Sequence, residues 1–328
     1  MPRDLLVPGT GGTKLLLDGD DIGWPGELTV AGWVARRSAL TEGFEALGAK
    51  YGSPEDIRRV LSMEHADDPN ALAPTRTTLW PGGSITSGPE LALVYNQFDG
   101  FDTFLYDWRQ DIRRSADLLL EKLTGTAGDP WRIVCHSQGG LVVVAAASKL
   151  AAQKGDDDRA FSRLVSHVAF VGVPFHGTLQ AADAFIRGET LAAPVAAAFK
   201  RVARTWPALY QMLPTWIGCV RRADHAGVET IQQTNLLYDL PWTGQQMLPS
   251  MLVRARDTRR DRLRAPMANF NGVKKRIFQS RAYPTPDHVV LTEAGPVLAG
   301  AVAGDTLVHS MLADDPTFAS AVKDFLKQ

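Results

Sequence analysis

The sequence has little of what marks several large classes of protein. Two cysteines in 328 residues cannot form a disulfide framework and supply too few ligands for a cysteine-based zinc site. The 35 Lys and Arg balance 36 Asp and Glu to a formal net charge of −1, which argues against a nucleic-acid-binding protein. No run approaches ~18 consecutive apolar residues, so a membrane-spanning helix is not expected.

The N-terminal stretch MPRDLLVPGTGG also lacks the charged-then-apolar pattern of a signal peptide. Together with the scarcity of cysteine, this predicts a cytoplasmic chain. No spacing of His, Cys, Asp or Glu suggests a metal site, and we expect no cofactor. Hydrophobic residues make up 45% and charged residues 22%, as in a globular protein, and the length allows one large domain or two ordinary ones.

Short apolar runs alternate with helical patterns in the first half of the chain, which indicates parallel strands joined by crossover helices. We expect strands at 5–7, 101–106, 131–135 and 164–173, and helices over 111–123 and 139–152. The second helix is apolar nearly all round, so it should lie inside the fold. The alternation resumes weakly at 276–280 and 289–303, and a last helix is expected over 316–326.

The alternation breaks down between residues 179 and 250, a region with several prolines and an Ala-rich segment. We interpret this region as an inserted helical cap on the main sheet. The sequence therefore predicts a core whose N-terminal part is 1–178, a cap or lid over 179–250, and a C-terminal core part over 251–328.

The segment CHSQGG at 135–140 lies between a predicted strand and a predicted helix. That context is the one a nucleophile elbow requires, because the serine hydroxyl must stand exposed on a tight strand-to-helix turn. Gly139 provides the small residue needed after the serine, whereas Cys135 stands where glycine is usual. The sequence predicts that Ser137 is a nucleophile. The alternative is an ordinary serine N-cap of a buried helix.

A glycine-rich loop, PGTGGTK at 8–14, follows the first predicted strand. A phosphate-binding loop is disfavoured because Thr13 intervenes before Lys14, and no G-x-G-x-x-G can be read there. In a serine hydrolase such a loop supplies one oxyanion N–H, and the residue after the nucleophile, Gln138, supplies the other. The alternative is a tight turn without a ligand.

Taken together, these segments resemble the lecithin:cholesterol acyltransferase-like branch of the α/β-hydrolases, which includes phospholipases and acyltransferases. The matching segments occur in the same order as in the family: LLVPGTGGTKL, FLYDWRQDIR, HSQGG, VGVPFHGT and WPALYQMLP. The fragments AYPTP and AGDTLV resemble the region that leads to the family's acid. It implies an α/β-hydrolase fold with a mostly parallel central sheet, helices on both faces and an inserted helical cap.

The resemblance also implies roles for single residues. Thr10 and Gln138 would donate the oxyanion-hole N–H groups, and Asp305 would be the acid of a catalytic triad. The YDWR segment has two interpretations: direct contact with substrate, or a brace in which an Asp–Arg pair and a buried indole support the loop. We interpret His176 as a loop residue.

The catalytic base is the weakest part of the pattern. A serine nucleophile needs a histidine, which follows the acid in this fold. After Asp305 the chain has one histidine, His309, four residues on, which is awkward for a carboxylate that must orient it. His309 could instead be oriented by Asp287, the true histidine could be absent or on another chain, or the protein could be catalytically weak. His288 is a less favoured base.

The sequence thus predicts a serine-dependent acyl-ester hydrolase or acyltransferase of the resembling type. A cluster of apolar cap residues favours lipid or another hydrophobic acyl ester as substrate and a transient contact with a membrane surface: Tyr210, Met212, Leu213 and Trp216. Ordinary packing of the cap is the alternative for that cluster. The competing functions are an α/β-hydrolase-like binding module without activity and a small-ester hydrolase.

Overall fold

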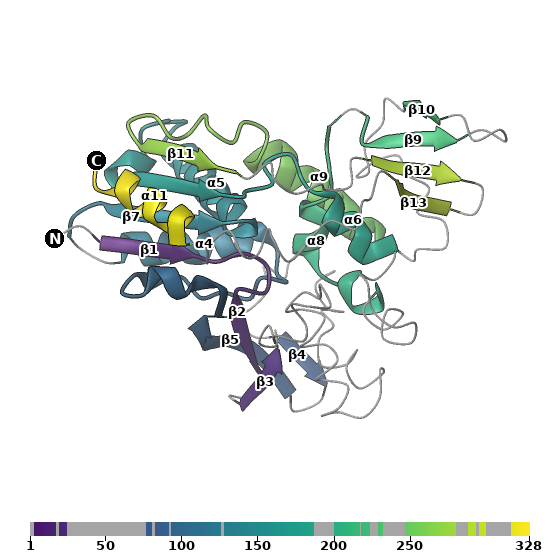
Figure 1. The fold of residues 1–328 in the computed structure, drawn as a ribbon, viewed down its shortest axis with the longest axis horizontal. Coiled ribbons are helices and arrows are strands. Elements are labelled where there is room, and N and C mark those ends of the chain that lie inside the picture. Colours follow the sequence, from purple (N-terminus) through teal and green to yellow (C-terminus); the bar gives the residue numbers. More distant parts are fainter. Residues whose placement is uncertain are drawn as a thin grey trace.

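The fold is built on a five-stranded sheet in which all pairings are parallel. The computed structural model describes residues 3–17, 20–24, 77–80, 83–91, 93–125, 128–186, 200–216, 218–223, 229–231, 247–279, 288–292, 295–299 and 316–328. The strands lie in the order β11–β8–β7–β1–β6, with β7 in the centre (Figure 1). Their bounds are β1 Arg3–Val7, β6 Asp102–Thr103, β7 Trp131–His136, β8 Val165–Val171 and β11 Lys274–Phe278.

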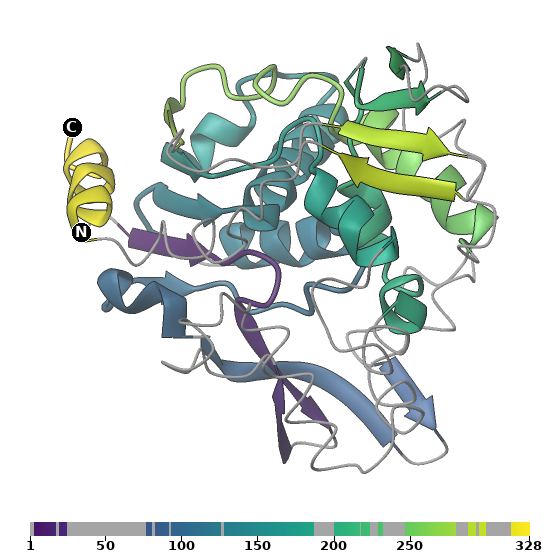
Figure 2. The same ribbon diagram turned by 45° about the vertical axis from the view of Figure 1, so that its right-hand side comes forward.

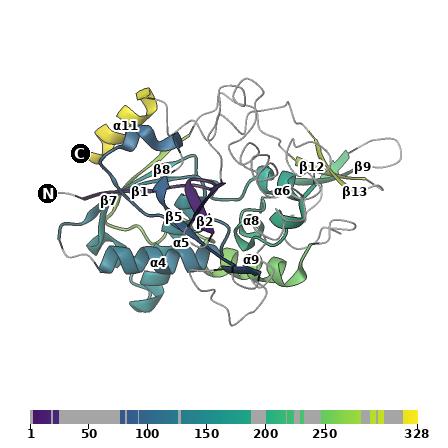
Figure 3. The same ribbon diagram turned by 90° about the horizontal axis from the view of Figure 1, so that it is seen from below.

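Apolar side chains alternate between the two faces of this sheet, and each face has its own helices. Cys135 packs with α4, Ile112–Thr124, and α5, Gln138–Gln153, whereas Val134 packs with the C-terminal helix α11, Pro316–Leu326. Figure 3 shows α11 and α4 on opposite sides of the strands. Side chains on both faces are thereby removed from water, which explains why the strands read as continuous apolar runs.

The arrangement confirms the expected α/β-hydrolase fold. Each strand and helix expected in the first half of the chain is present, with ends that differ by a few residues, and α11 has the expected bounds. The predicted strand at 101–106 is reduced to β6; the amide of Phe104 still donates to the carbonyl of Leu6 of β1 at 2.9 Å, and residues 104–107 have no strand assignment.

Two antiparallel or mixed sheets, which the sequence pattern does not predict, lie beside the central one (Figure 2). The first has the order β3–β2–β5–β4 and consists of Asp20–Trp24, Thr13–Leu17, Gly83–Leu91 and Thr77–Trp80. The second has the order β10–β9–β12–β13 and consists of Glu229–Ile231, Val220–Ala223, His288–Thr292 and Gly295–Ala299. The alternation around 289–303 therefore belongs to this second sheet, and not to the central one.

The region 179–250 contains strands as well as helices. Its described helices are α6, Leu179–Ile186, and α8, Pro207–Gln211, and it also supplies β9 and β10. β9 pairs with β12, so the second small sheet joins this region to the segment that follows β11. The division into core and cap stays a prediction. The helix α9, Pro249–Arg262, and the short helices η2, Leu93–Phe98, and η3, Phe161–Arg163, complete the elements.

Candidate active site

Ser137 occupies the turn between β7 and α5 in a strained backbone conformation. Its φ of 50° and ψ of −125° lie in a sparsely populated region that costs about 1–3 kcal/mol. The side chain is half-buried and makes no capping hydrogen bond to α5, although the residue stands at the N-cap position. A nucleophile elbow requires a backbone of this kind, whereas the side chain of an ordinary N-cap serine would bond to its helix.

The glycine loop packs directly against this turn. A Cβ placed on Gly9 would lie 2.8 Å from the Cβ of Ser137, and one on Gly139 would collide with the carbonyl oxygens of Val7 and Pro8. Glycine is therefore required at both positions so that the two backbones can approach. This close contact explains why a small residue is needed after the serine.

The loop itself is a tight turn that brings Thr10 to Gln138. The amide of Gly12 donates to the carbonyl of Gly9 at 3.0 Å, and Gly11 adopts a φ of 73°. The hydroxyl of Thr10 donates to the Gln138 Oε1 at 2.6 Å. The two residues expected to form the oxyanion hole thus lie together at the serine turn.

The side chain of Gln138 also holds the YDWR segment. It is fully buried, and its Nε2 donates to the carbonyl of Trp108 at 2.9 Å. One amide group therefore links the glycine loop, the N-terminus of α5 and the segment after β6. Because both ends of the amide are bonded, the side chain is fixed in one orientation.

The YDWR residues support the glycine loop as a brace, which is one of the two interpretations that the sequence allows. Arg109 and Asp107 form a buried bidentate ion pair with distances of 2.9 and 2.7 Å. The Trp108 indole donates to the carbonyl of Thr13 at 3.0 Å, and the Tyr106 hydroxyl donates to the carbonyl of Pro8 at 2.8 Å. These bonds fix both ends of the glycine loop.

Tyr95 is a site residue that the sequence analysis missed. Its hydroxyl accepts the amide of Gly9 at 2.8 Å and lies 2.9 Å from Nδ1 of His136. Burial raises the pKa of Tyr95, so the phenol stays protonated and can donate to that nitrogen. Nothing in the sequence around residue 95 marks it, since its partners are distant along the chain.

Cys135 is not a competing nucleophile. Its thiol is completely buried and donates to the carbonyl of Ala169 at 3.5 Å. Burial raises its pKa well above the ordinary value of a thiol, which disfavours the reactive thiolate.

The predicted acid and base lie outside the described residues. This holds for Asp305, His309 and Asp287, and for the side chain of His288, whose backbone begins β12. His176 is exposed on the loop after β8, where its carbonyl accepts bonds from Thr215, as expected of a loop residue. The triad Ser137, Asp305 and His309 therefore stays a prediction.

The predicted substrate-binding residues are close together but mostly buried. Tyr210, Met212 and Leu213 belong to the main apolar core, and Trp216 packs against it half-buried. The Tyr210 hydroxyl donates to the carbonyl of Arg204 at 2.7 Å and accepts the amide of Leu248 at 3.2 Å. These contacts favour the packing interpretation for Tyr210, and the substrate-binding role of the group stays a prediction.

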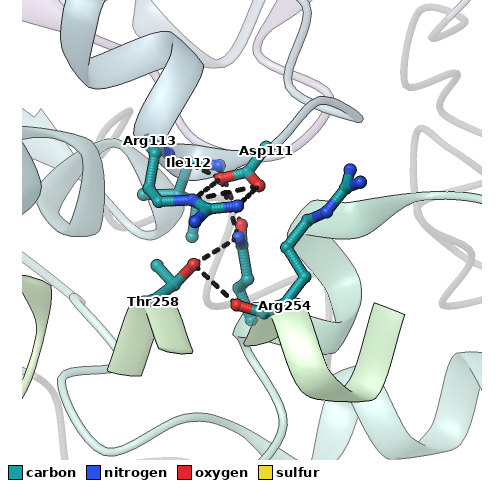
Figure 4. Close-up of polar contacts among 6 residues, drawn as sticks. Asp111, Ile112, Arg113, Arg254 and Thr258 are labelled. Atoms are coloured by element: carbon teal, nitrogen blue, oxygen red, sulfur yellow. Dashed lines mark hydrogen bonds and ion pairs between the residues drawn. The ribbon is translucent and has the colours of Figure 1, made fainter. Parts of the chain in front are cut away.

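A buried polar network fixes α8 against α4 and α9 (Figure 4). The Gln211 Oε1 accepts the amide of Ile112 at 2.8 Å, while its Nε2 donates to Asp111 at 2.8 Å and to Thr258 at 2.9 Å. Arg113 forms an ion pair with Asp111, and this hydrogen bond raises the pKa of the arginine. The segment that carries WPALYQMLP is thus held at the N-terminus of the first core helix.

The part of the chain that the structure describes contains no group of three or more His, Cys, Asp and Glu side chains placed to hold a metal ion. Nor does any helix in this part of the chain combine the length and apolar character needed to cross a membrane.

Comparisons with known proteins find one matching family model and a similar solved structure. The family model described as lecithin:cholesterol acyltransferase matches residues 100–250. No curated protein matches the chain. A solved structure described as the crystal structure of the Tle4–Tli4 complex is 13% identical, with a TM-score of 0.45, and the match covers 99% of this chain and 71% of that one. The match to the family model confirms the resemblance over residues 100–250, a little under half of the chain.

Proposed function

We propose that the protein is a serine-dependent acyl-ester hydrolase or acyltransferase that acts on lipid or other hydrophobic acyl esters. The observation that carries this proposal is the backbone of Ser137, strained at the head of α5 and packed against a glycine loop. A strained backbone adds no stability to the start of a helix, whereas an elbow needs it to expose the hydroxyl.

In the proposed reaction, the Oγ of Ser137 attacks the ester carbonyl carbon while His309 takes the hydroxyl proton. The carbonyl oxygen becomes an oxyanion held by the backbone N–H groups of Thr10 and Gln138. Collapse of this intermediate expels the alcohol, which takes the proton from the histidine and leaves an acyl group on Ser137. Water or a second alcohol then attacks the acyl-enzyme in the same way. Asp305 or Asp287 would orient the imidazole.

The assignment of the oxyanion donors is supported by the bonds around them. The amide of Gly9 already donates to Tyr95, so the next amide along the turn, that of Thr10, is the better candidate. Gln138 is the first residue of α5, where N–H groups have no partner within the helix and the helix dipole favours negative charge.

The family match at residues 100–250 supports the proposed substrate class. Long-chain acyl esters are expected to react faster than acetyl esters, with the apolar residues around Trp216 next to the chain. We also propose a cytoplasmic location, which is supported by two buried free cysteines.

A fluorophosphonate probe tests the nucleophile. Labelling of the purified protein and its loss in Ser137→Ala are expected, because the probe reacts with activated serine hydroxyls. Ser166→Ala, which removes a hydroxyl on β8, is the matched control and should label normally. If the folded protein does not label, the chain is a binding module. Faster turnover of acetyl than of long-chain esters would instead identify a small-ester hydrolase.

A further inference from the structure

An apolar cavity opens at the edge strand of the central sheet, and its lining includes none of the residues assigned to the reaction. It has a volume of about 390 Å³ and is lined by Phe175, His176, Ala265, Pro266, Met267, Ala268 and Ile277. The Ile277 side chain is 47% exposed, so the cavity is open to solvent. Six of the seven lining residues are apolar, which favours a hydrocarbon group as occupant.

The strand register places this cavity near the candidate active site. Ile277 of β11 is paired with Phe170 of β8, which is paired with Cys135 of β7, two residues before Ser137. Two strand spacings amount to roughly 10 Å. The loop after β8 contributes Phe175 and His176 to the cavity and lies at the same carboxyl edge of the sheet as the serine turn.

The segment that supplies most of the cavity lining carries a positive charge. Residues 263–277 contain four Lys or Arg and no Asp or Glu, a net charge of +4 in a chain whose total is −1. Arg264, next to the cavity-lining loop, is exposed, and so is Lys275, which shares its face of the edge strand with Ile277. Lys275 also donates to the carbonyl of Phe270 at 3.1 Å, a bond to a neutral group that leaves its charge in place.

Exposed large hydrophobic side chains occur on α9 and on the edge strand β11, which frame residues 263–273. Among the described residues these are Val253 and Ile277, and Ile277 is the one that lines the cavity. Basic residues beside exposed apolar side chains are the combination that binds anionic lipid surfaces, because charges attract the headgroups while apolar groups enter the acyl boundary. A nucleic acid would use the charges but would leave the apolar cavity empty.

We propose that the face formed by residues 263–277 docks onto an anionic phospholipid surface, with Ile277 and the cavity beside it receiving an acyl chain. Docking there would present the lipid to the carboxyl edge of the sheet, where Ser137 stands. The inference goes beyond the proposed function, because binding to vesicles does not need the Ser137 chemistry.

Co-sedimentation with vesicles tests this proposal, using Ser137→Ala so that no lipid is consumed. Binding is expected to vesicles of phosphatidylcholine with 30% phosphatidylglycerol, and it should fall with salt. Arg264→Gln and Lys275→Gln should each weaken binding roughly fivefold, the effect of one basic residue near an anionic surface. Ile277→Asn should remove the part of the binding that persists at high salt.

The matched control is Lys154→Gln, which removes one exposed charge at the far end of α5, roughly 24 Å of helix from Ser137. It should bind like the parent. Equal binding to pure phosphatidylcholine, no effect of Arg264→Gln and Lys275→Gln, or tighter binding of a duplex oligonucleotide than of anionic vesicles would each overturn the proposal. Because the vesicle assay is independent of probe labelling, failure of one leaves the other unaffected.

Discussion

At the scale of single residues, conformational strain gathers at Ser137. The strained backbone persists because its neighbours fix it: the amide of Ser137 donates to the carbonyl of Val171 at 2.9 Å, and its carbonyl accepts the amide of Gly140 at 3.0 Å. A positive φ destabilises any residue with a Cβ. Such strain persists at sites where function requires a particular position of the side chain, here the hydroxyl of Ser137.

Ser137→Gly should therefore abolish esterase activity and at the same time stabilise the fold. Glycine adopts a φ of 50° without steric cost, so the free energy of unfolding should rise by about 1 kcal/mol. Urea denaturation measures this, with Ser137→Ala as the control that keeps the Cβ. A less stable glycine variant would show that the turn is not strained.

Tyr95 connects the two halves of the site through one hydroxyl group. It accepts from Gly9 and faces His136, so it sets where the glycine loop stands relative to the serine turn. We expect it to be a positioning residue, because its partners would not themselves contact the reacting ester.

Tyr95→Phe should lower kcat with little change in KM. Without the acceptor, the Gly9 amide is left unsatisfied at a cost of about 1–3 kcal/mol, and the loop loses the position that its neighbouring amide needs for the oxyanion. Steady-state kinetics and thermal unfolding should be measured together. Thr124→Val, which removes a hydroxyl bond at the end of α4, should lower stability only. If the Tyr95→Phe variant had reduced stability but a normal kcat, Tyr95 would have a structural role only.

At the scale of elements, one glutamine side chain joins three helices. Gln211 of α8 satisfies the first amide of α4 and bonds to Asp111 and to Thr258 of α9 (Figure 4). A fully satisfied buried amide defines a single arrangement of its neighbours, whereas apolar contacts alone would allow them to slide.

Gln211→Leu should destabilise the protein by about 2–4 kcal/mol, because the Ile112 amide and the Asp111 carboxylate lose buried partners together. The free energy of unfolding from urea titration measures the loss. Ser320→Ala on the exposed side of α11 is the neutral control. A change below about 0.5 kcal/mol, the usual range of surface substitutions, would contradict the role of the network.

At the scale of the whole molecule, the C-terminal helix closes one face of the sheet. Phe325 of α11 packs edge-on against the ring of His167 on β8, with centroids 5.8 Å apart. The pKa of His167 is lowered, mainly by burial and further by the positive charges of Lys274 and Arg132. The neutral imidazole is therefore the form that the folded protein accommodates.

Acid should accordingly weaken the fold through His167. Its folded pKa lies below the ordinary value of 6.5, so the unfolded chain binds the proton more readily and stability falls as pH drops below that value. His167→Gln should lose less stability than the parent between pH 7.5 and 5.5, measured as the shift in Tm. An identical pH dependence in both proteins would rule out this contribution.

Local sequence patterns were sufficient to predict the strand and helix that carry the candidate site, but they did not predict the two small sheets beside the central one. The apolar runs and caps of β7 and α5 are contiguous in sequence, and the elbow between them is a short motif with its own steric requirements. The small sheets depend on pairing between distant segments, such as β2 with β5 and β9 with β12. Such pairings leave no periodic signal that distinguishes them from other strands.

The sequence by itself determined the alternation of strands and helices, the serine at the head of a buried helix and the glycine loop, because each follows from steric and burial rules acting over a few residues. Only the tertiary structure decided that Gln138 and Tyr95 hold that loop in place, and that basic residues border an apolar cavity beside Ile277. Those relations join residues far apart along the chain, and they come into existence when folding brings the carboxyl ends of parallel strands to one edge.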